Sequence, residues 1–246
     1  ASGIEDVLII TNRGKGAIED HFDHAFELEA KLEGNESKKK IYDDVMQCSN
    51  FGNIYFIRQK ETKGLGHAVL CAKSFVGNEP FAVLYGDDVI ISETPVTKQL
   101  CDAYEKYGKG AVGVKEVPGK AITKYCSLAV DPIEDNCYNC TDMIEKPSEE
   151  EILSNFSILG RVVMPPEIFD ILEETPLGAG NELQLTDAMK TLAQTKGVVA
   201  VDYEGTRYDM GNKFGILQAN IEVGLKHPET QDELKDYIKK IAKDLD

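Results

Sequence analysis

The chain has 246 residues, of which 43 are acidic and 27 are basic, so its formal net charge at pH 7 is −16. Apolar residues make up 42% of the chain and charged residues 28%, a composition that excludes wholesale disorder. No stretch approaches the roughly 20 consecutive apolar residues of a membrane span, so we expect no membrane partner. We also expect no nucleic-acid partner, because binding a polyanion needs clustered Lys and Arg.

Cysteine usage indicates a reducing compartment. The first residues lack the pattern of a signal peptide, so we expect a cytoplasmic protein whose six cysteines are reduced thiols. Cys137 and Cys140 have the spacing of half a zinc site, but no second CxxC or His pair accompanies them. We therefore favour a turn between two strands at this point over a metal site.

Strand-like and helix-like segments alternate in the first half of the chain. Short apolar runs predict strands at 7–10, 54–57, 81–85 and 111–117. Helical spacing of apolar residues predicts helices at 17–33, 36–48, 64–75 and 96–107. Strands that are each followed by a helix predict a parallel sheet that is covered on both faces.

The second half has a different pattern. Short strand-like segments without helical periods between them lie at 128–130, 143–145 and 158–164, and they predict an antiparallel elaboration. Further helices are expected at 165–174, 183–195 and 213–226, with a strand at 198–203. The segment 231–246 predicts an amphipathic helix with the apolar stripe Leu234, Tyr237, Ile238, Ile241 and Leu245. We expect residues 1–246 to form one domain, with 228–246 as a C-terminal helix suited to contacts in a homo-oligomer.

A glycine-rich turn, Gly64-Leu65-Gly66-His67-Ala68, follows a predicted strand and opens a predicted helix. Glycine allows backbone N–H groups to approach a base, sugar or phosphate closely, and a helix N-terminus favours negative charge. The turn is not a dinucleotide fingerprint, because Leu70 stands where the third glycine of that motif is required. An ordinary tight turn between a strand and a helix is the alternative interpretation.

Two aspartates follow predicted strands directly. Asp87 lies in the segment that ends the apolar strand 81–85, and Asp209 precedes Gly211 and a helix. Carboxylates beyond the carboxyl ends of strands are suitable Mg²⁺ ligands. The alternative is that each Asp caps the turn or helix that comes next.

Glu145 and Lys146 lie at the end of a strand-like segment that Pro147 terminates. A functional Glu at this point would bond sugar hydroxyls, and the Lys ammonium would meet a phosphate as a point charge. The alternative is a pair of solvated charges at the end of a strand.

These motifs, in this order, resemble the bacterial UTP–glucose-1-phosphate uridylyltransferases. The matching segments cover nearly the whole chain: Arg58-Gln59, Lys63-Gly64-Leu65-Gly66-His67-Ala68-Val69, Gly86-Asp87-Asp88, Glu145-Lys146-Pro147, Ser154-Asn155, Gly180-Asn181-Glu182-Leu183-Gln184-Leu185-Thr186-Asp187 and Asp209-Met210-Gly211-Asn212-Lys213. The resemblance implies a three-layer, Rossmann-like α/β nucleotidyltransferase fold, with a mostly parallel mixed sheet and a helical C-terminal appendage.

The resemblance also implies a Mg²⁺-dependent transfer in which UTP and glucose 1-phosphate give UDP-glucose and pyrophosphate. The implied positions are Gln59 and Gly64 at uracil, Asp87 and Asp209 at Mg²⁺, Glu145 at the glucose hydroxyls, and Lys146 at the sugar phosphate. Gly86, Asn155 and Glu182 are implied as further substrate-binding residues. Lys146 and Asp87 are implied as catalytic residues, because this transfer needs positioning and charge neutralisation more than proton movement.

The chain departs from the family pattern at two points. The family begins with a strand and a Gly-x-Gly-Thr-Arg loop that grips the triphosphate, and the chain starts after that point. We therefore expect an N-terminally incomplete domain, in which residues 1–246 alone have little transferase activity. The family has Tyr-Gly where this chain has Tyr125-Cys126, so we expect a different local contact with the sugar.

Three other functions stay open on the sequence. One is a non-catalytic module that binds a sugar phosphate but lacks the triphosphate loop. Another is a related sugar-1-phosphate nucleotidyltransferase that uses a different nucleotide. The third is a dinucleotide-dependent oxidoreductase built around the turn at 64–68, although the acidic residue that would hold a ribose is missing.

Overall fold

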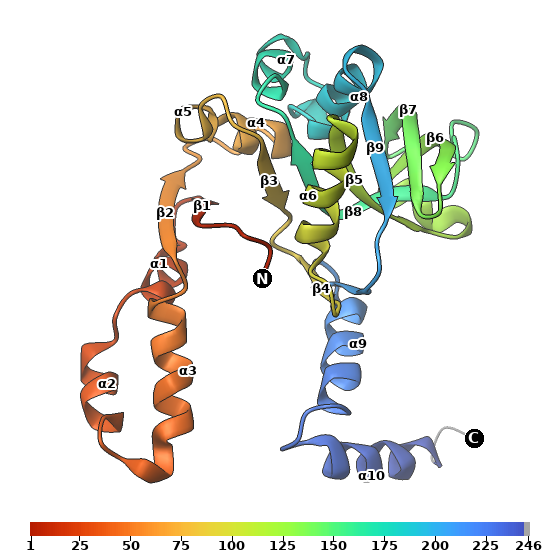
Figure 1. Ribbon diagram of the computed structural model, residues 1–246. Helices are drawn as coiled ribbons and strands as arrows, with labels where there is room; N and C mark the ends of the chain where they lie inside the picture. The colour runs from red at the N-terminus through yellow and green to blue at the C-terminus, as the bar shows by residue number, and fades with distance from the viewer. Residues whose placement is uncertain (244–246) are drawn as a thin grey trace.

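A computed structural model describes residues 1–243, so Leu245 of the predicted stripe lies outside the described residues (Figure 1). The strands are β1 (Asp6–Thr11), β2 (Asn53–Arg58), β3 (Phe81–Leu84), β4 (Asp88–Ile91), β5 (Gly110–Glu116), β6 (Cys126–Glu134), β7 (Cys137–Glu145), β8 (Phe156–Met164), β9 (Val198–Asp202) and β10 (Thr206–Asp209). The helices are α1 (Gly16–Phe22), α2 (Phe26–Leu32), α3 (Lys39–Ser49), α4 (Leu65–Leu70), α5 (Lys73–Val76), α6 (Val96–Tyr107), α7 (Ile168–Glu174), α8 (Leu185–Thr195), α9 (Lys213–Gly224) and α10 (Gln231–Ala242).

Within residues 1–243, the largest sheet has six strands in the order β3-β8-β5-β9-β7-β6. β5 and β9 pair in parallel, whereas β8 is antiparallel to β3 and β5, and β7 is antiparallel to β9 and β6. β3, β5, β9 and β6 therefore point one way, and β8 and β7 point the other way. β1 and β2 form a separate parallel pair, and β4 and β10 form an antiparallel pair. The sheet is mixed, as predicted, and the β6–β7 hairpin is its antiparallel elaboration.

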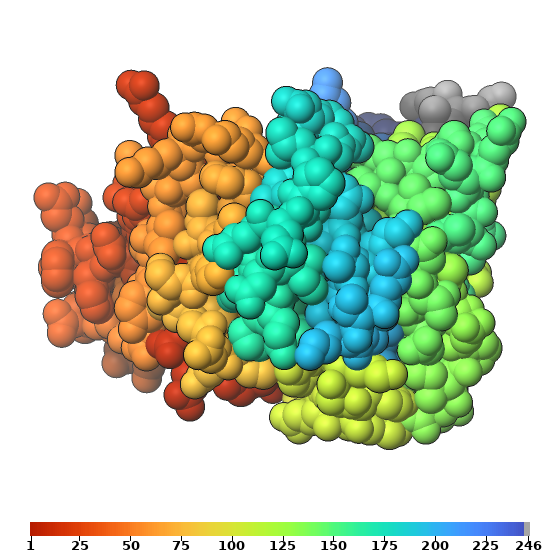
Figure 2. All heavy atoms as spheres, turned by 90° about the horizontal axis from the view of Figure 1, so that it is seen from above, coloured from red at the N-terminus to blue at the C-terminus, as the bar shows by residue number. Residues whose placement is uncertain are grey.

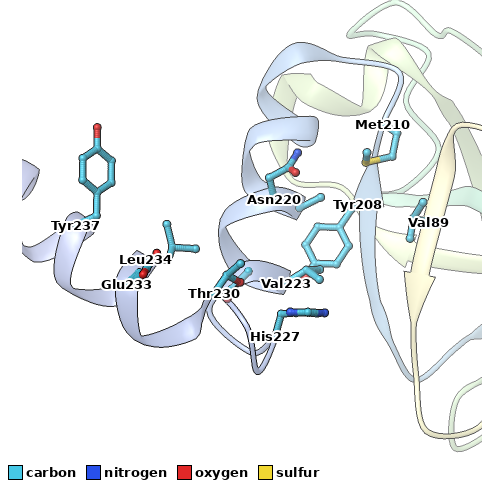
Figure 3. Close-up of a pocket in the computed structure, with 12 residues that line it drawn as sticks. Val89, Tyr208, Met210, Asn220, Val223, His227, Thr230, Glu233, Leu234 and Tyr237 are labelled. Carbon is cyan, nitrogen blue, oxygen red and sulfur yellow. Dashed lines mark hydrogen bonds between the residues drawn. The ribbon is translucent and has the colours of Figure 1, made fainter. Parts of the chain in front are cut away.

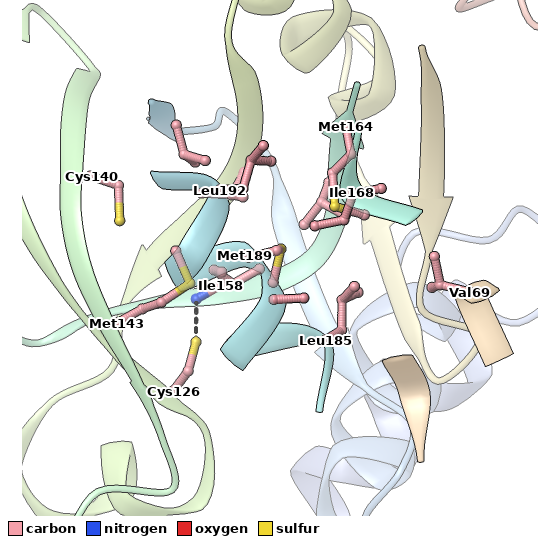
Figure 4. Packing of buried hydrophobic residues seen from close by; sticks show 14 of the residues in the cluster. Val69, Cys126, Cys140, Met143, Ile158, Met164, Ile168, Leu185, Met189 and Leu192 are labelled. Carbon is pink, nitrogen blue, oxygen red and sulfur yellow. Dashed lines mark hydrogen bonds between the residues drawn. The ribbon is translucent and has the colours of Figure 1, made fainter. Parts of the chain in front are cut away.

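Alternating side chains of the central strands build two cores, one on each face of the sheet. On β9, Val198 and Ala200 pack with α7 and α8, while Val199 and Val201 pack with α6. Figure 4 shows the first of these cores, in which Met189 and Leu192 of α8 lie over the sheet. Because side chains alternate between the faces of a strand, helices on both sides are needed to cover it. The predicted three-layer α/β arrangement is confirmed.

Some predicted helices are interrupted in the structure. The region predicted as one helix at 17–33 forms α1 and α2, because Asp23 adopts extended backbone angles and ends α1. The region predicted at 64–75 forms α4 and the four-residue α5. Apolar spacing continues across both breaks, so periodicity alone does not reveal them.

The helices α9 and α10 lie apart from the sheet, below β4 in Figure 1. Seen from above, α7 lies between the N-terminal segments and the β6–β7 hairpin (Figure 2). Within the described part of the chain, no helix combines the length and hydropathy that crossing a membrane requires.

Candidate active site

The first part of the candidate site is the turn between β2 and α4. Gln59 follows β2, and its backbone N–H donates to Thr11 O at 2.8 Å. Its side-chain Nε2 donates to Gly64 O at 3.2 Å and lies 2.9 Å from His67 Nδ1. Residues 12, 13 and 59–63 line a cavity of about 470 Å³ beyond the ends of the parallel strands β1 and β2. Ligands commonly bind at such ends of parallel strands.

The glycine turn is joined to the segment around Leu183 by backbone hydrogen bonds. Leu183 N donates to Lys63 O at 2.8 Å, and Gly66 N donates to Leu183 O at 2.9 Å. Gly64 has φ +96°, and a Cβ atom there would lie 2.8 Å from both Glu182 Cβ and Leu183 O. Gly64 and Gly66 are therefore required for close packing of the two segments, in agreement with the tight-turn interpretation.

The second segment leads into α8 and reaches the end of β7. Glu182 is exposed, and its carbonyl accepts a hydrogen bond from Gly178 N at 2.8 Å. Thr186, in the first turn of α8, donates its hydroxyl to Glu145 Oε2 at 2.8 Å. One carboxylate oxygen of Glu145 is thereby fixed, and the other has no hydrogen bond to a described residue.

Lys146 follows β7 with a left-handed backbone, φ +46°, which is uncommon outside glycine. Its backbone N–H donates to Tyr125 O at 2.7 Å, and its side chain is exposed. Pro147 comes next and is buried, so the chain leaves the sheet directly after Lys146. A strained non-glycine residue at a strand end fits the prediction that Lys146 acts in a binding site.

Asp87 and Asp209 come together beside Gly211. Met210 N donates to Asp87 O at 2.7 Å, which ties the turn after β3 to the end of β10. A Cβ atom on Gly211 would lie 2.9 Å from Asp87 Oδ2 and 3.1 Å from Asp209 Oδ1. Both carboxylates therefore reach one small region, as two ligands of a shared cation must.

Hydrogen bonds keep Asp209 ionised. Burial alone would raise the pKa of Asp209, but it is outweighed by the Tyr125 hydroxyl, the Gly211 N–H and the charge of Arg207, which lower that pKa below its ordinary value. The Tyr125 hydroxyl donates to Asp209 Oδ2 at 2.8 Å, and Gly211 N donates to Oδ1 at 2.9 Å. An ionised carboxylate is the form that a cation binds.

Asp88, the neighbour of Asp87, has a different role. It is buried at the start of β4 and forms a salt bridge with Arg207 Nε. Burial raises the pKa of Asp88, although the hydrogen bond and charge of Arg207 oppose the shift. Arg207 also lies 3.7 Å from Asp209 Oδ2 and over the ring of Tyr125. Asp88 therefore serves the structure, and Asp87 is exposed and accessible to a ligand.

The donors present fit a Mg²⁺ ion. Within residues 1–243 no group of three or more His, Cys, Asp or Glu side chains could hold a metal ion, so Asp87 and Asp209 would act as a pair. Mg²⁺ commonly takes one or two carboxylates and completes its shell with water and substrate phosphates. The turn predicted at Cys137 and Cys140 is displaced in the structure: both residues lie in strand β7, and the turn between β6 and β7 is at Asp135 and Asn136.

A chain of hydrogen bonds links most of the predicted site residues. It runs from Gln59 and Gly64 through the 182–186 segment to Glu145, and from Lys146 through Tyr125 to Asp209. Gly86 lies in the turn before Asp87, with open space around it. Asn155 also stands outside this chain of bonds: its carbonyl accepts from Val117 N, and its exposed side chain joins no part of it.

A larger cavity elsewhere in the described part of the chain is not this site. It has a volume of about 890 Å³ and lies between β4, β10, α9 and α10 (Figure 3). Tyr208 and Met210 line it, and Asp209 between them points to the opposite side of the strand. Its lining is mainly apolar and contains none of the predicted site residues.

Comparison with known proteins identifies the family. Residues 1–224 match the sequence profile of a family described as nucleotidyl transferase. The chain belongs to the nucleotidyl transferase family. A UTP–glucose-1-phosphate uridylyltransferase of Staphylococcus epidermidis is 47% identical over 240 residues, which cover 98% of this chain and 83% of the relative.

Solved structures of nucleotidyl transferases agree with this assignment. A UDP-glucose pyrophosphorylase complexed with UDP-glucose has a TM-score of 0.84 at 36% identity, covering 92% of this chain and 83% of that one. A UTP-bound UDP-glucose pyrophosphorylase of Acinetobacter baumannii has a TM-score of 0.83 at 33% identity, covering 96% of this chain and 83% of that one. The resemblance inferred from the motifs is confirmed.

The structure explains how this nucleotidyl transferase accommodates Cys126. Cys126 opens β6 opposite Glu145, and it is not among the residues with positive φ. Its buried sulfur accepts a hydrogen bond from Ile158 N at 3.3 Å (Figure 4). The backbone at this position therefore does not require glycine, and the side chain points into the core.

Four residues near the site received no role from the sequence. Tyr125 and Arg207 surround Asp209, Thr186 holds Glu145, and His67 contacts Gln59. Thr186 and His67 lie inside motifs that carry the resemblance, so their neighbourhood was indicated. Tyr125 matches the tyrosine of the family's Tyr-Gly pair, but the sequence did not indicate its contact with Asp209. Arg207 lies outside the matching segments, and its contacts depend on pairing between distant strands.

Proposed function

We propose that this nucleotidyl transferase joins UTP and glucose 1-phosphate to give UDP-glucose and pyrophosphate. The observation that carries the proposal is the chain of hydrogen bonds that links a base-binding turn, a sugar-side carboxylate and a paired aspartate site. The 47% identical relative with that name supports the choice of both substrates.

The proposed roles follow from the chemistry of each side chain. Gln59 and Gly64 contact uracil, and Glu145 accepts hydrogen bonds from glucose hydroxyls through its free carboxylate oxygen. Lys146 meets the phosphate of glucose 1-phosphate. Gly86, Asn155 and Glu182 are proposed as further substrate contacts.

The reaction breaks one phosphorus–oxygen bond and forms another. A phosphate oxygen of glucose 1-phosphate attacks the α-phosphorus of UTP, and the bond to pyrophosphate breaks as the new bond forms. The protein must hold the two phosphates in line and offset their negative charge. On a chain of net charge −16, the Lys146 ammonium supplies positive charge locally, next to the sugar phosphate.

Asp87 and Asp209 are the residues that would hold Mg²⁺. When bound, the ion would supply charge neutralisation for the phosphates of the nucleotide. Tyr125 and Gly211 keep Asp209 in place and ionised, and Met210 N fixes the main chain of Asp87.

The test is a coupled assay for pyrophosphate release with full-length protein, in which the nucleotide and the sugar phosphate are varied separately. We expect turnover with UTP and glucose 1-phosphate, loss of turnover on chelation, and recovery when Mg²⁺ is restored. If the protein binds glucose 1-phosphate but gives no turnover with any nucleotide, the non-catalytic module is favoured instead. A preference for another nucleotide would favour a related transferase.

We place the reaction in the cytoplasm, in one domain that includes residues 1–246 and self-associates. All six cysteines are free thiols, as a reducing compartment maintains them.

The hydrogen bonds that connect the turn after β2, the end of β7 and β10 support a single catalytic unit. Self-association is proposed through α10, whose exposed residues include Tyr237 and Ile241.

A further inference from the structure

We propose that His67 is a positioning residue that fixes the side-chain amide of Gln59, so that its oxygen selects uracil over cytosine. The inference rests on the proposed function, because it concerns the base of the nucleotide. It adds a residue to which no role has been assigned above, and it gives a physical origin for base selection.

The orientation of the Gln59 amide follows from its two partners. Gly64 O can only accept a hydrogen bond, so the amide atom 3.2 Å from it must be the nitrogen. The same nitrogen lies 2.9 Å from His67 Nδ1, and an amide nitrogen can only donate. Nδ1 must therefore be unprotonated, and a neutral His67 carries its proton on Nε2.

Both partners are themselves held in place. Gly64 O also accepts from Ala68 N at 3.2 Å, and a Cβ atom on Gly64 would meet Leu183 O at 2.8 Å. Gly66 N, one residue before His67, is bonded to Leu183 O. The turn and the start of α4 are thus fixed against the 182–183 segment, and His67 cannot move away without breaking these contacts.

The arrangement leaves Gln59 Oε1 as the only unused polar atom of the side chain. No described residue donates a hydrogen bond to it, and Gln59 lines the 470 Å³ cavity. An acceptor at this point matches the N3–H group of uracil. Cytosine presents an acceptor at N3, so in the same pose it would place two acceptors against each other, which is costly when water is excluded. Thymine has the same N3–H edge as uracil.

The experiment compares two variants in the full-length enzyme. His67→Phe keeps the volume of the ring but removes the acceptor, whereas His67→Asn places an amide oxygen near the former Nδ1. We expect His67→Phe to raise KM for UTP about fivefold and to lower the preference for UTP over CTP by a similar factor, the usual effect of one neutral hydrogen bond. His67→Asn should restore most of both.

Several readouts should stay unchanged in His67→Phe. The preference for UTP over TTP should hold, because the two bases share the N3–H edge. The KM for glucose 1-phosphate and kcat should stay within about twofold of wild type, since one hydrogen bond to the base contributes little elsewhere. A structural role for His67 would instead lower kcat and raise both KM values together.

Two results would overturn the inference while leaving the proposed function intact. One is that wild type and His67→Phe prefer UTP over CTP by the same ratio. The other is a nitrogen chemical shift in wild-type protein showing that His67 Nδ1 carries the proton, a measurement that holds even if His67→Phe does not fold. A wild-type protein that turns over no uridine nucleotide would instead refute the proposed function.

Discussion

Lys146 combines a charge at the site with a backbone that a lysine adopts only at a cost. A left-handed non-glycine residue costs roughly 1–3 kcal/mol, and Lys146 has φ +46°. We predict that Lys146→Ala raises KM for glucose 1-phosphate and lowers kcat while UTP kinetics change little, because the ammonium acts on the sugar phosphate. Lys146→Arg should not restore full activity, since a planar guanidinium presents its donors differently. Steady-state kinetics with each substrate varied in turn measure this.

Lys146→Gly is the matched control for the backbone. Glycine adopts positive φ without strain, so this variant should unfold at a temperature at or above that of wild type while losing activity as Lys146→Ala does. Unchanged kinetics for glucose 1-phosphate in both variants would remove Lys146 from the site.

Tyr125 supports Asp209 through its hydroxyl. Burial and the hydrogen bond to Asp209 raise the pKa of Tyr125, so the hydroxyl keeps its proton and donates at neutral pH. We predict that Tyr125→Phe lowers activity at limiting Mg²⁺ by about 10–100-fold, the usual effect of removing a group that orients a metal ligand. Added Mg²⁺ should recover much of the loss. Tyr55→Phe, on the surface at β2, is the control, and an equal loss there would show a non-specific effect.

The buried cysteines should be unreactive in the folded protein. Burial raises the pKa of Cys126 to about 11 and that of Cys140 to about 12. At pH 8 only about one Cys126 thiol in a thousand is then ionised, and the thiolate is the reactive form. We predict that iodoacetamide at pH 8 labels neither residue until the protein is unfolded, as followed by peptide mass spectrometry. Rapid native labelling of Cys126 would show that its sulfur is not enclosed in the hydrophobic core.

At the level of elements, apolar periodicity predicted most of the strands but missed two short ones, β4 and β10. The apolar runs at 54–57 and 111–117 match β2 and β5. β5 is a buried strand, which needs continuous apolar residues, whereas β2 has no fully buried residue. β4 and β10 have four residues each: the apolar run in β4 is only three residues long, and β10 contains Arg207 and Asp209, so neither was predicted as a strand. Those two strands bring Asp87 and Asp209 together, which the sequence could suggest only through the family resemblance.

The contact between α4 and the 182–183 segment depends on the absence of a side chain at Gly66. A Cβ atom there would lie 2.7 Å from Leu183 O and 3.0 Å from Leu172 Cδ2, so the segments would have to separate. We predict that Gly66→Ala lowers the free energy of unfolding by about 1–3 kcal/mol and raises KM for UTP, because overpacking displaces the turn. Urea denaturation and nucleotide kinetics measure the two effects.

Gly16→Ala is the control for this prediction. Gly16 opens α1, has no atom within 4 Å of an added Cβ, and has no positive φ. Alanine favours helix relative to glycine, so stability should stay within about 0.5 kcal/mol or increase slightly. Equal destabilisation in both variants would contradict the packing argument at Gly66.

On the scale of the whole molecule, the apolar surface of the C-terminal helices lies away from the proposed active site. Leu234 of α10 packs near Gly224 of α9, which leaves Tyr237 and Ile241 facing outward with 60% and 40% of their surface exposed. The first turn of α10 is acidic, with Asp232 and Glu233, and its last turn is basic. Two copies of α10 placed antiparallel would therefore pair opposite charges at both ends, as a two-fold symmetric contact requires.

We predict that the protein is a dimer through α10, and that Tyr237→Glu combined with Ile241→Glu dissociates it, because the contact would then bury carboxylates without partners. Lys235→Glu, which adds the same amount of negative charge on an exposed position of α10, is the control and should leave the dimer largely intact. Sedimentation velocity over a range of concentrations gives the mass of each variant. Kinetic constants should be nearly the same in monomer and dimer, since the hydrogen-bonded site residues lie on β2, β7, β10 and the turns beside them. A wild-type protein that sediments as a monomer would refute the dimer. A double variant that remains a dimer would show that the contact does not lie on α10.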